Sequence, residues 1–157
     1  MTSPKIRIVD DLALRSQLVA ILHTTEKEIL LDYVQEIISV TKKKIDLQFL
    51  DAQAIDNTII TFLKWRKKEV NLKILRENIF NLHSLASTET NELTKVYYRF
   101  VAHALATAHV MEHLVVALDY LIKYVNIKTD NNKKESASNR LLQINILNDI
   151  IKSKQKV

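Results

Sequence analysis

The sequence contains no glycine, although average usage would give a chain of 157 residues roughly 11 of them. Glycine supplies the positive φ angles of tight hairpin turns and lets the backbone approach phosphate groups closely. Its absence excludes the Gly-rich loops that bind phosphate, including the dinucleotide fingerprint and the P-loop. It also argues against a sheet of β-hairpins, and the single proline, Pro4, leaves the rest of the chain free to form uninterrupted helices. The composition therefore predicts an all-α protein.

Cysteine is absent as well, which excludes disulfides, thiolate metal sites and a thiol nucleophile. The opening residues, MTSPKIRIVDD, lack the apolar core of a signal peptide, so we expect a cytoplasmic protein. The 23 basic and 18 acidic residues leave a net charge of +5, and this mild excess is spread along the chain. We therefore do not expect nucleic acid to be the partner.

The most apolar stretch is Val101–Val125, in which only Glu112, Asp119 and Lys123 are charged. Their spacing places the three charges on one narrow arc of a helix whose remaining surface is mostly apolar. Two acidic residues near the middle would be costly in a membrane, so we expect no membrane partner. The stretch is predicted to be the buried central helix of a single-domain bundle of about six to seven helices, spanning residues 1–157.

Helical periodicity around this stretch extends further, from Ser87-Thr88-Glu89 to Val125. An unbroken helix of that length would measure about 55 Å. A compact domain of this size is only about 40 Å across. We therefore expect a break or sharp kink at His109-Val110-Met111.

The other helices are predicted from their capping residues and from apolar positions at helical spacing. The expected N-terminal caps are Asp10 or Asp11, a capping box of Thr25 and Glu28, Asp51, Asn71, and Ser136 or Ser138. The positions expected to face the core are Leu14, Leu18, Ile21, Leu22, Ile29, Tyr33, Ile37, Val40, Ile55, Ile59, Phe62, Leu63, Leu72, Leu75, Ile79, Leu82, Ala86, Leu141, Ile144, Leu147 and Ile151.

Three segments are expected to lie outside the helices. Residues 1–9 form an irregular lead-in and residues 152–157 a basic tail. Residues 126–138 form an exposed loop, because this is the one stretch of low hydrophobicity.

Two charged surfaces have alternative interpretations. Glu28, Asp32 and Glu36 repeat every four residues and form a row that we call the acidic edge. The acidic edge is either a solvated helix face or a surface that docks a partner. The run Trp65-Arg66-Lys67-Lys68 resembles a stacking platform for nucleic acid, but packing of the Trp against the core, with the Lys stems outside, is the favoured interpretation.

Four of the five histidines are His83, His103, His109 and His113. The run from His109 to His113 has the inverse His-x-x-Glu-His spacing of some zinc enzymes, with Glu112 as the acid. Zinc would need a third ligand, those enzymes carry a sheet beside the helix, and a break at Val110 would spoil the facing of the two rings. We therefore predict hydrogen-bonded histidines within a helical core, no metal, no cofactor and no enzymatic activity, with a metal-dependent enzyme as an alternative.

One segment carries a family resemblance. Ala106-Thr107-Ala108-His109-Val110 is followed by His113, Ala117 and Tyr120, and upstream lie Trp65, Glu69-Val70, Arg76 and His83 at matching spacings. This pattern resembles the small all-helical bacterial proteins named putative immunity proteins, which are associated with toxin–immunity systems. Members of that family usually have glycine near the positions of Lys68, Ala102 and Val116, and often proline where Met111 stands.

The resemblance implies a non-enzymatic protein that neutralises a cognate toxin by stoichiometric contact. It also implies candidate binding residues, which are Trp65, Arg76, His83, Thr107, His109, His113 and Tyr120. The net charge of +5 predicts an acidic or mixed surface on the toxin, unless the acidic edge is the docking face. The alternative function is a helical scaffold or oligomerisation domain without a toxin, and a homodimer stays open.

Overall fold

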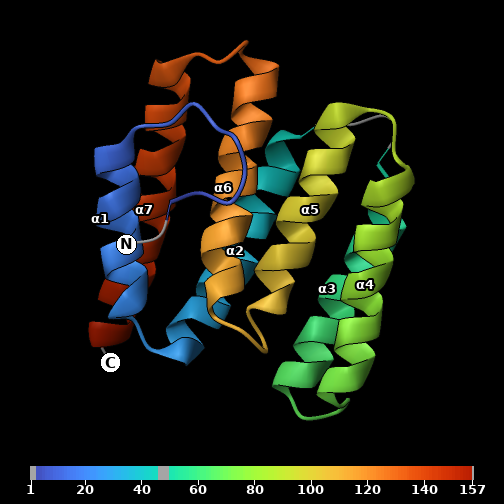
Figure 1. The fold of residues 1–157 in the computed structure, drawn as a ribbon. Coiled ribbons are helices and arrows are strands. Elements are labelled where there is room, and N and C mark those ends of the chain that lie inside the picture. The colour runs from blue at the N-terminus through green and yellow to red at the C-terminus, as the bar shows by residue number, and fades with distance from the viewer. Residues whose placement is uncertain (1–2, 46–49, 157) are drawn as a thin grey trace. The chain divides into compact units, whose positions relative to one another are not determined.

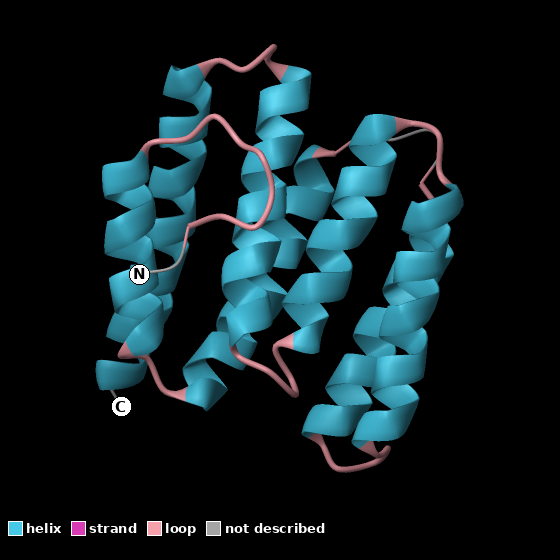
Figure 2. Cartoon of the chain, in the orientation of Figure 1, coloured by secondary structure: helices cyan, strands magenta, loops and turns pink. Residues whose placement is uncertain are grey.

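The computed structural model describes residues 3–45 and 50–156, and every regular element within these ranges is an α-helix (Figure 2). The prediction of an all-α protein with six to seven helices is confirmed. The helices of the described ranges are α1 (Leu12–His23), α2 (Lys27–Lys44), α3 (Ala52–Arg66), α4 (Leu72–Thr88), α5 (Glu92–Ala106), α6 (Glu112–Lys128) and α7 (Lys133–Gln155).

The chain forms two compact units. Unit 1 consists of Met1–Ile45 and Ile122–Val157, and unit 2 consists of Asp46–Leu121, so the boundary lies within α6. In unit 1, α7 packs against α1 and α2. In unit 2, α4 packs against α3 and α5, and Figure 1 shows α3 and α4 side by side. The single domain over residues 1–157 stays a prediction.

Three helices begin at the caps that the sequence predicts. The carboxylates of Asp11 and Asp51 and the amide oxygen of Asn71 each accept a hydrogen bond from the backbone amide three residues ahead, at 3.0, 2.9 and 3.1 Å respectively. These bonds satisfy amides that have no partner within the helix. The starts of α1, α3 and α4 therefore follow from local sequence.

The predicted capping box at the start of α2 is wrong. The helix begins at Lys27, and its cap residue, Glu26, makes no side-chain capping bond. The Thr25 hydroxyl instead donates to the carbonyl of Ile21 at 2.6 Å. The Thr25 hydroxyl thus bonds a backbone carbonyl near the end of α1 and does not cap the start of α2.

The predicted break in the long apolar segment is confirmed, because α5 ends at Ala106 and α6 begins at Glu112. The predicted start of that segment is wrong, since Ser87 and Thr88 are the last residues of α4. Asn91 caps α5 instead, with its side-chain oxygen accepting from the amide of Thr94 at 3.0 Å. The long apolar segment therefore forms two helices, α5 and α6.

The expected polar arc of α6 also needs correction. Asp119 is only 2% exposed, whereas Glu112 is exposed, so the two acids do not share a solvated face. Lys123 donates to the backbone carbonyl of Arg7 at 3.0 Å. Among the described helices, none combines the length and the hydropathy needed to cross a membrane.

The exposed loop predicted over residues 126–138 is wrong. The helix α6 continues to Lys128, and α7 begins at Lys133 with Asn132 as its cap rather than Ser136 or Ser138. The predicted basic tail is also largely helical, because α7 extends to Gln155. Only a short turn therefore separates α6 from α7.

Two polar residues of this region are buried. The Asn126 side chain accepts from the amide of Val9 at 2.7 Å and donates to the Val9 carbonyl and to the Ser136 hydroxyl, each at 2.9 Å. Ser136 is itself fully buried. Asn126 and Ser136 therefore belong to an internal polar network that holds the non-helical lead-in, whereas residues 130–135 are exposed, as expected for a polar stretch.

Two helices end in a left-handed residue although the chain has no glycine. Lys68 follows the cap of α3 with φ 63°, and Asp130 follows that of α6 with φ 53°. In both places the next amide reaches back to a carbonyl inside the helix, from Glu69 to Lys64 and from Asn131 to Asn126. This is the Schellman arrangement, which normally uses glycine at the left-handed position.

Most predicted core positions are buried or half-buried. Leu141 is an exception at 47% exposed, because α7 turns a polar face inward. Arg140 of the same helix is only 1% exposed. It donates from Nη2 to Asp10 Oδ2 at 2.8 Å and from Nη1 to Gln143 Oε1 at 3.0 Å. Asp10, one of the two predicted caps, is thus the partner of a buried cation. The fully or largely buried predicted positions are Leu18, Leu22, Tyr33, Ile37, Ile55, Phe62, Leu75, Ile79, Leu82, Ala86, Ile144 and Leu147.

Candidate functional site

A hollow of about 540 Å³ in unit 2 brings together four of the seven candidate binding residues that the family pattern gives, Arg76, His83, His109 and His113. We call it the histidine pocket. It is lined by Lys73, Arg76, Glu77, Ile79, Phe80, His83, Ala106, His109 and His113.

One face of α4 forms the first wall. Lys73, Arg76, Phe80 and His83 follow one another at steps of three or four residues, which places them on the same side of a helix. Ile79, on the neighbouring row, is 5% exposed and belongs to the core, whereas Phe80 is 71% exposed. The wall thus runs from buried apolar surface to an exposed aromatic ring.

The break between α5 and α6 forms the second wall. After Ala106 the backbone makes tight turns, with the amide of Val110 donating to the Ala106 carbonyl and that of His113 to the Val110 carbonyl, each at 3.2 Å. His109 lies in the break and His113 in the first turn of α6, and their ring centroids are 5.2 Å apart. The two rings are therefore close to each other despite the break, but they are tilted by 52°.

His103 connects the two walls through ring contacts. Its Nδ1 lies 3.0 Å from His113 Nδ1, and its ring meets that of His83 edge-on at 4.8 Å between centroids. Its ring also stacks on Tyr120 at 5.3 Å. A hydrogen bond between two Nδ1 atoms needs one proton donor and one acceptor, so His103 and His113 are not both positively charged while that bond exists.

His83 is held as an acceptor. Arg99 Nη1 lies 2.6 Å from His83 Nδ1, and a guanidinium can only donate. Nδ1 of His83 is therefore unprotonated. Burial, followed by the charges of Arg99 and His113, lowers the pKa of His83 to about 4.

The histidines are not the interior residues that the sequence predicted. His83, His103, His109 and His113 are half-buried, and all but His103 line the pocket. Within the described ranges, no group of three or more His, Cys, Asp or Glu side chains is placed to hold a metal ion.

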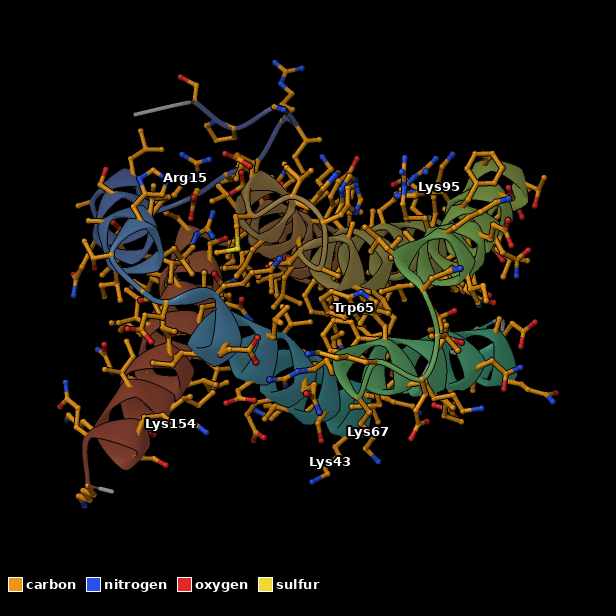
Figure 3. The ribbon with its side chains drawn as sticks, turned by 90° about the horizontal axis from the view of Figure 1, so that it is seen from below. Arg15, Lys43, Trp65, Lys67, Lys95 and Lys154 are labelled. Carbon is orange, nitrogen blue, oxygen red and sulfur yellow. The ribbon has the colours of Figure 1, made fainter. Side chains whose placement is uncertain are left out.

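The remaining candidate residues lie beside the pocket or away from it. Trp65 lies in α3 with its ring 5.9 Å from that of Phe62, and Figure 3 shows it turned inward while Lys67 points outward. Trp65 therefore packs sideways, as predicted. Thr107 is fully buried in the break, and its hydroxyl has no hydrogen-bond partner among the described residues.

The acidic edge lies on α2, in unit 1, whereas the histidine pocket belongs to unit 2. Glu28 and Glu36 are exposed, and Asp32 between them is half-buried. Lys154 of α7, labelled in Figure 3, lies with its Nζ 3.1 Å from Asp32 Oδ2. The middle of the acidic edge is therefore partly neutralised within the chain.

Sequence reasoning missed Lys73, Glu77 and Phe80 as pocket residues. A signal was available, because Arg76 and His83 define a helix face and these residues fall on or beside it. The bond between Arg99 and His83 had no such signal, since it joins α5 to α4.

The comparisons with known proteins give one match. A family model described as Imm-5 like putative immunity protein matches residues 20–149, which include both walls of the histidine pocket. No curated protein and no solved structure matches the chain.

Proposed function

Because the chain belongs to the Imm-5 like putative immunity protein family, we propose that it is a non-enzymatic immunity protein. It neutralises one cognate bacterial toxin by stoichiometric protein–protein contact. The family match is the observation that carries this proposal, since it extends over most of the chain, from residue 20 to residue 149.

In this mechanism the chain covers the active site or the substrate groove of the toxin. A stable interface of that kind buries about 1,200–2,000 Å² in total. A helical surface that keeps its conformation on binding would keep the entropy cost of association low.

The net charge of +5 restricts the kind of toxin. An inhibitor that covers the basic groove of a nuclease gains from being acidic, because complementary charge steers association. A basic inhibitor fits a toxin whose contact surface is acidic or mixed. We therefore expect a toxin with acidic groups around its functional site.

Co-expression with the product of the adjacent open reading frame tests the proposal. That product alone should arrest growth, and the present chain should restore growth and co-purify with it. A frameshifted copy of the chain is the control. Unchanged growth arrest, or a neighbour that is not toxic, counts against the proposal; a stable homodimer with a wide apolar interface favours a scaffold domain instead.

A further inference from the structure

We propose that the histidine pocket is the toxin-binding surface, and that it receives a segment of the toxin in which a carboxylate lies beside an apolar side chain. This inference rests on the proposed function and adds the place and the chemistry of the contact.

The charges of the pocket favour an anionic group. Lys73 and Arg76 are cations, and Glu77 is the only acid among the described residues of the lining. Within the described residues, neither Lys73 nor Arg76 forms an ion pair or a hydrogen bond through its side chain, so both cations are available to a partner. An Arg guanidinium and a carboxylate form two parallel hydrogen bonds, which gives direction as well as energy.

The imidazoles add to this preference. Burial, followed by the charges of Arg99 and His113, disfavours the protonated form of His83. A carboxylate entering the pocket would bring a negative charge close to these positive charges. The charges around the imidazoles therefore favour an anionic group in the pocket.

An apolar neighbour is indicated by Phe80. At 71% exposed it is the most exposed large apolar side chain of the described residues, and it lies one turn of α4 from Arg76. Aromatic residues and Arg are enriched in the cores of protein interfaces and among residues that dominate binding. Ile79 and Ala106 extend the apolar lining inward.

The size of the pocket suits a few side chains. A volume of about 540 Å³ lies within the 300–1,000 Å³ typical of pockets that enclose a compact ligand. The acidic edge is the competing surface, but it carries the opposite charge and Lys154 already pairs with its Asp32. The histidine pocket therefore matches the acidic partner that the net charge of +5 predicts.

Two substitutions test the pocket, Arg76→Glu and Phe80→Ala. The probe is a catalytically inactive form of the toxin that the co-expression experiment identifies. Each substitution should weaken binding at least about tenfold, as expected for residues at the centre of an interface. The matched controls are Lys152→Glu and Leu141→Ala on α7, where an exposed cation and an exposed leucine undergo comparable changes. Both controls should bind within twofold of the wild type.

The outcomes separate the two proposals. If the wild type binds the toxin and both pocket variants bind within twofold of it, the pocket inference is overturned while the proposed function stands. If Glu36→Lys loses binding while the two pocket variants keep it, the toxin docks on the acidic edge. The pocket inference is then overturned in the same way. A wild-type chain that neither protects nor binds removes the proposed function and this inference together. Hydrogen exchange of the wild-type complex gives a check without mutation, since residues 73–83 should gain protection.

Discussion

At the scale of single residues, the bond between Arg99 and His83 determines a protonation state. The guanidinium holds the proton, so the imidazole stays neutral to accept it. Protonation of His83 would break this bond and place two cations side by side. In the unfolded chain neither restriction exists, and the imidazole titrates near pH 6.5.

This difference predicts a loss of stability in acid. The pKa of His83 is lowered to about 4 in the folded chain, so between that value and pH 6.5 the unfolded chain binds more protons. The contribution of neutral His83 to the free energy of unfolding is fully present above pH 6.5 and declines as the pH falls toward 4. Urea unfolding at a series of pH values should show a smaller decline for His83→Gln than for the wild type. Equal declines, or an NMR titration of His83 near 6.5, would contradict the assignment.

Lys68 provides a second test at this scale. Its φ of 63° lies in the left-handed region, where a side chain costs about 1 kcal/mol or more and glycine is favoured. We expect Lys68→Gly to stabilise the chain by about 1 kcal/mol in thermal or urea unfolding. Lys67→Gly is the control, because this substitution removes the same charge at a residue whose φ is −84°. It should give no gain in stability. Equal effects of both substitutions would argue against the left-handed conformation.

At the scale of helices, the sequence predicts what local chemistry decides. The caps Asp11, Asp51 and Asn71 accept hydrogen bonds from backbone amides three residues ahead. Because this interaction is local, the starts of three helices could be predicted from the sequence. The break after Ala106 followed from the length of the apolar segment. The turn after α6 was missed because its usual mark, glycine, is replaced by Asp130. The polarity of Asn126 gave no sign of its burial, since its partner Val9 is distant in sequence.

The start of α7 gives a direct prediction for an element. Asn132 accepts from the amide of Glu135 at 3.2 Å, and Ser138 lies in the second turn of the helix, exposed. Asn132→Ala should lower the free energy of unfolding by about 1 kcal/mol, the usual cost of losing an N-cap. Ser138→Ala should leave the stability nearly unchanged. A larger effect at Ser138 would restore the longer loop that the sequence predicted.

The candidate site was predictable only in part. His83, His109 and His113 were identified from the family pattern, and the structure places all three around one hollow with Arg76. Their half-burial was not predictable, because it depends on how α4 packs against α5. Phe80 was missed because the sequence does not show whether an aromatic residue of a helix points toward the core or toward solvent. The orientation of α4 decides this.

At the scale of the whole molecule, two surfaces of opposite charge lie in different units. The histidine pocket in unit 2 carries Lys73 and Arg76, and the acidic edge in unit 1 carries Glu28 and Glu36. A toxin that meets the pocket associates faster at low salt, because opposite charges steer the encounter. A scaffold domain would instead use its apolar surface to bind a second copy of itself.

Titration of the wild-type chain with inactive toxin tests the central claim most directly. Calorimetry should give one toxin bound per chain, and light scattering should give a complex with the mass of one toxin plus 18.2 kDa. If no heat is detected at micromolar concentrations and the chain remains a monomer or a homodimer in the presence of toxin, the chain does not act by stoichiometric contact.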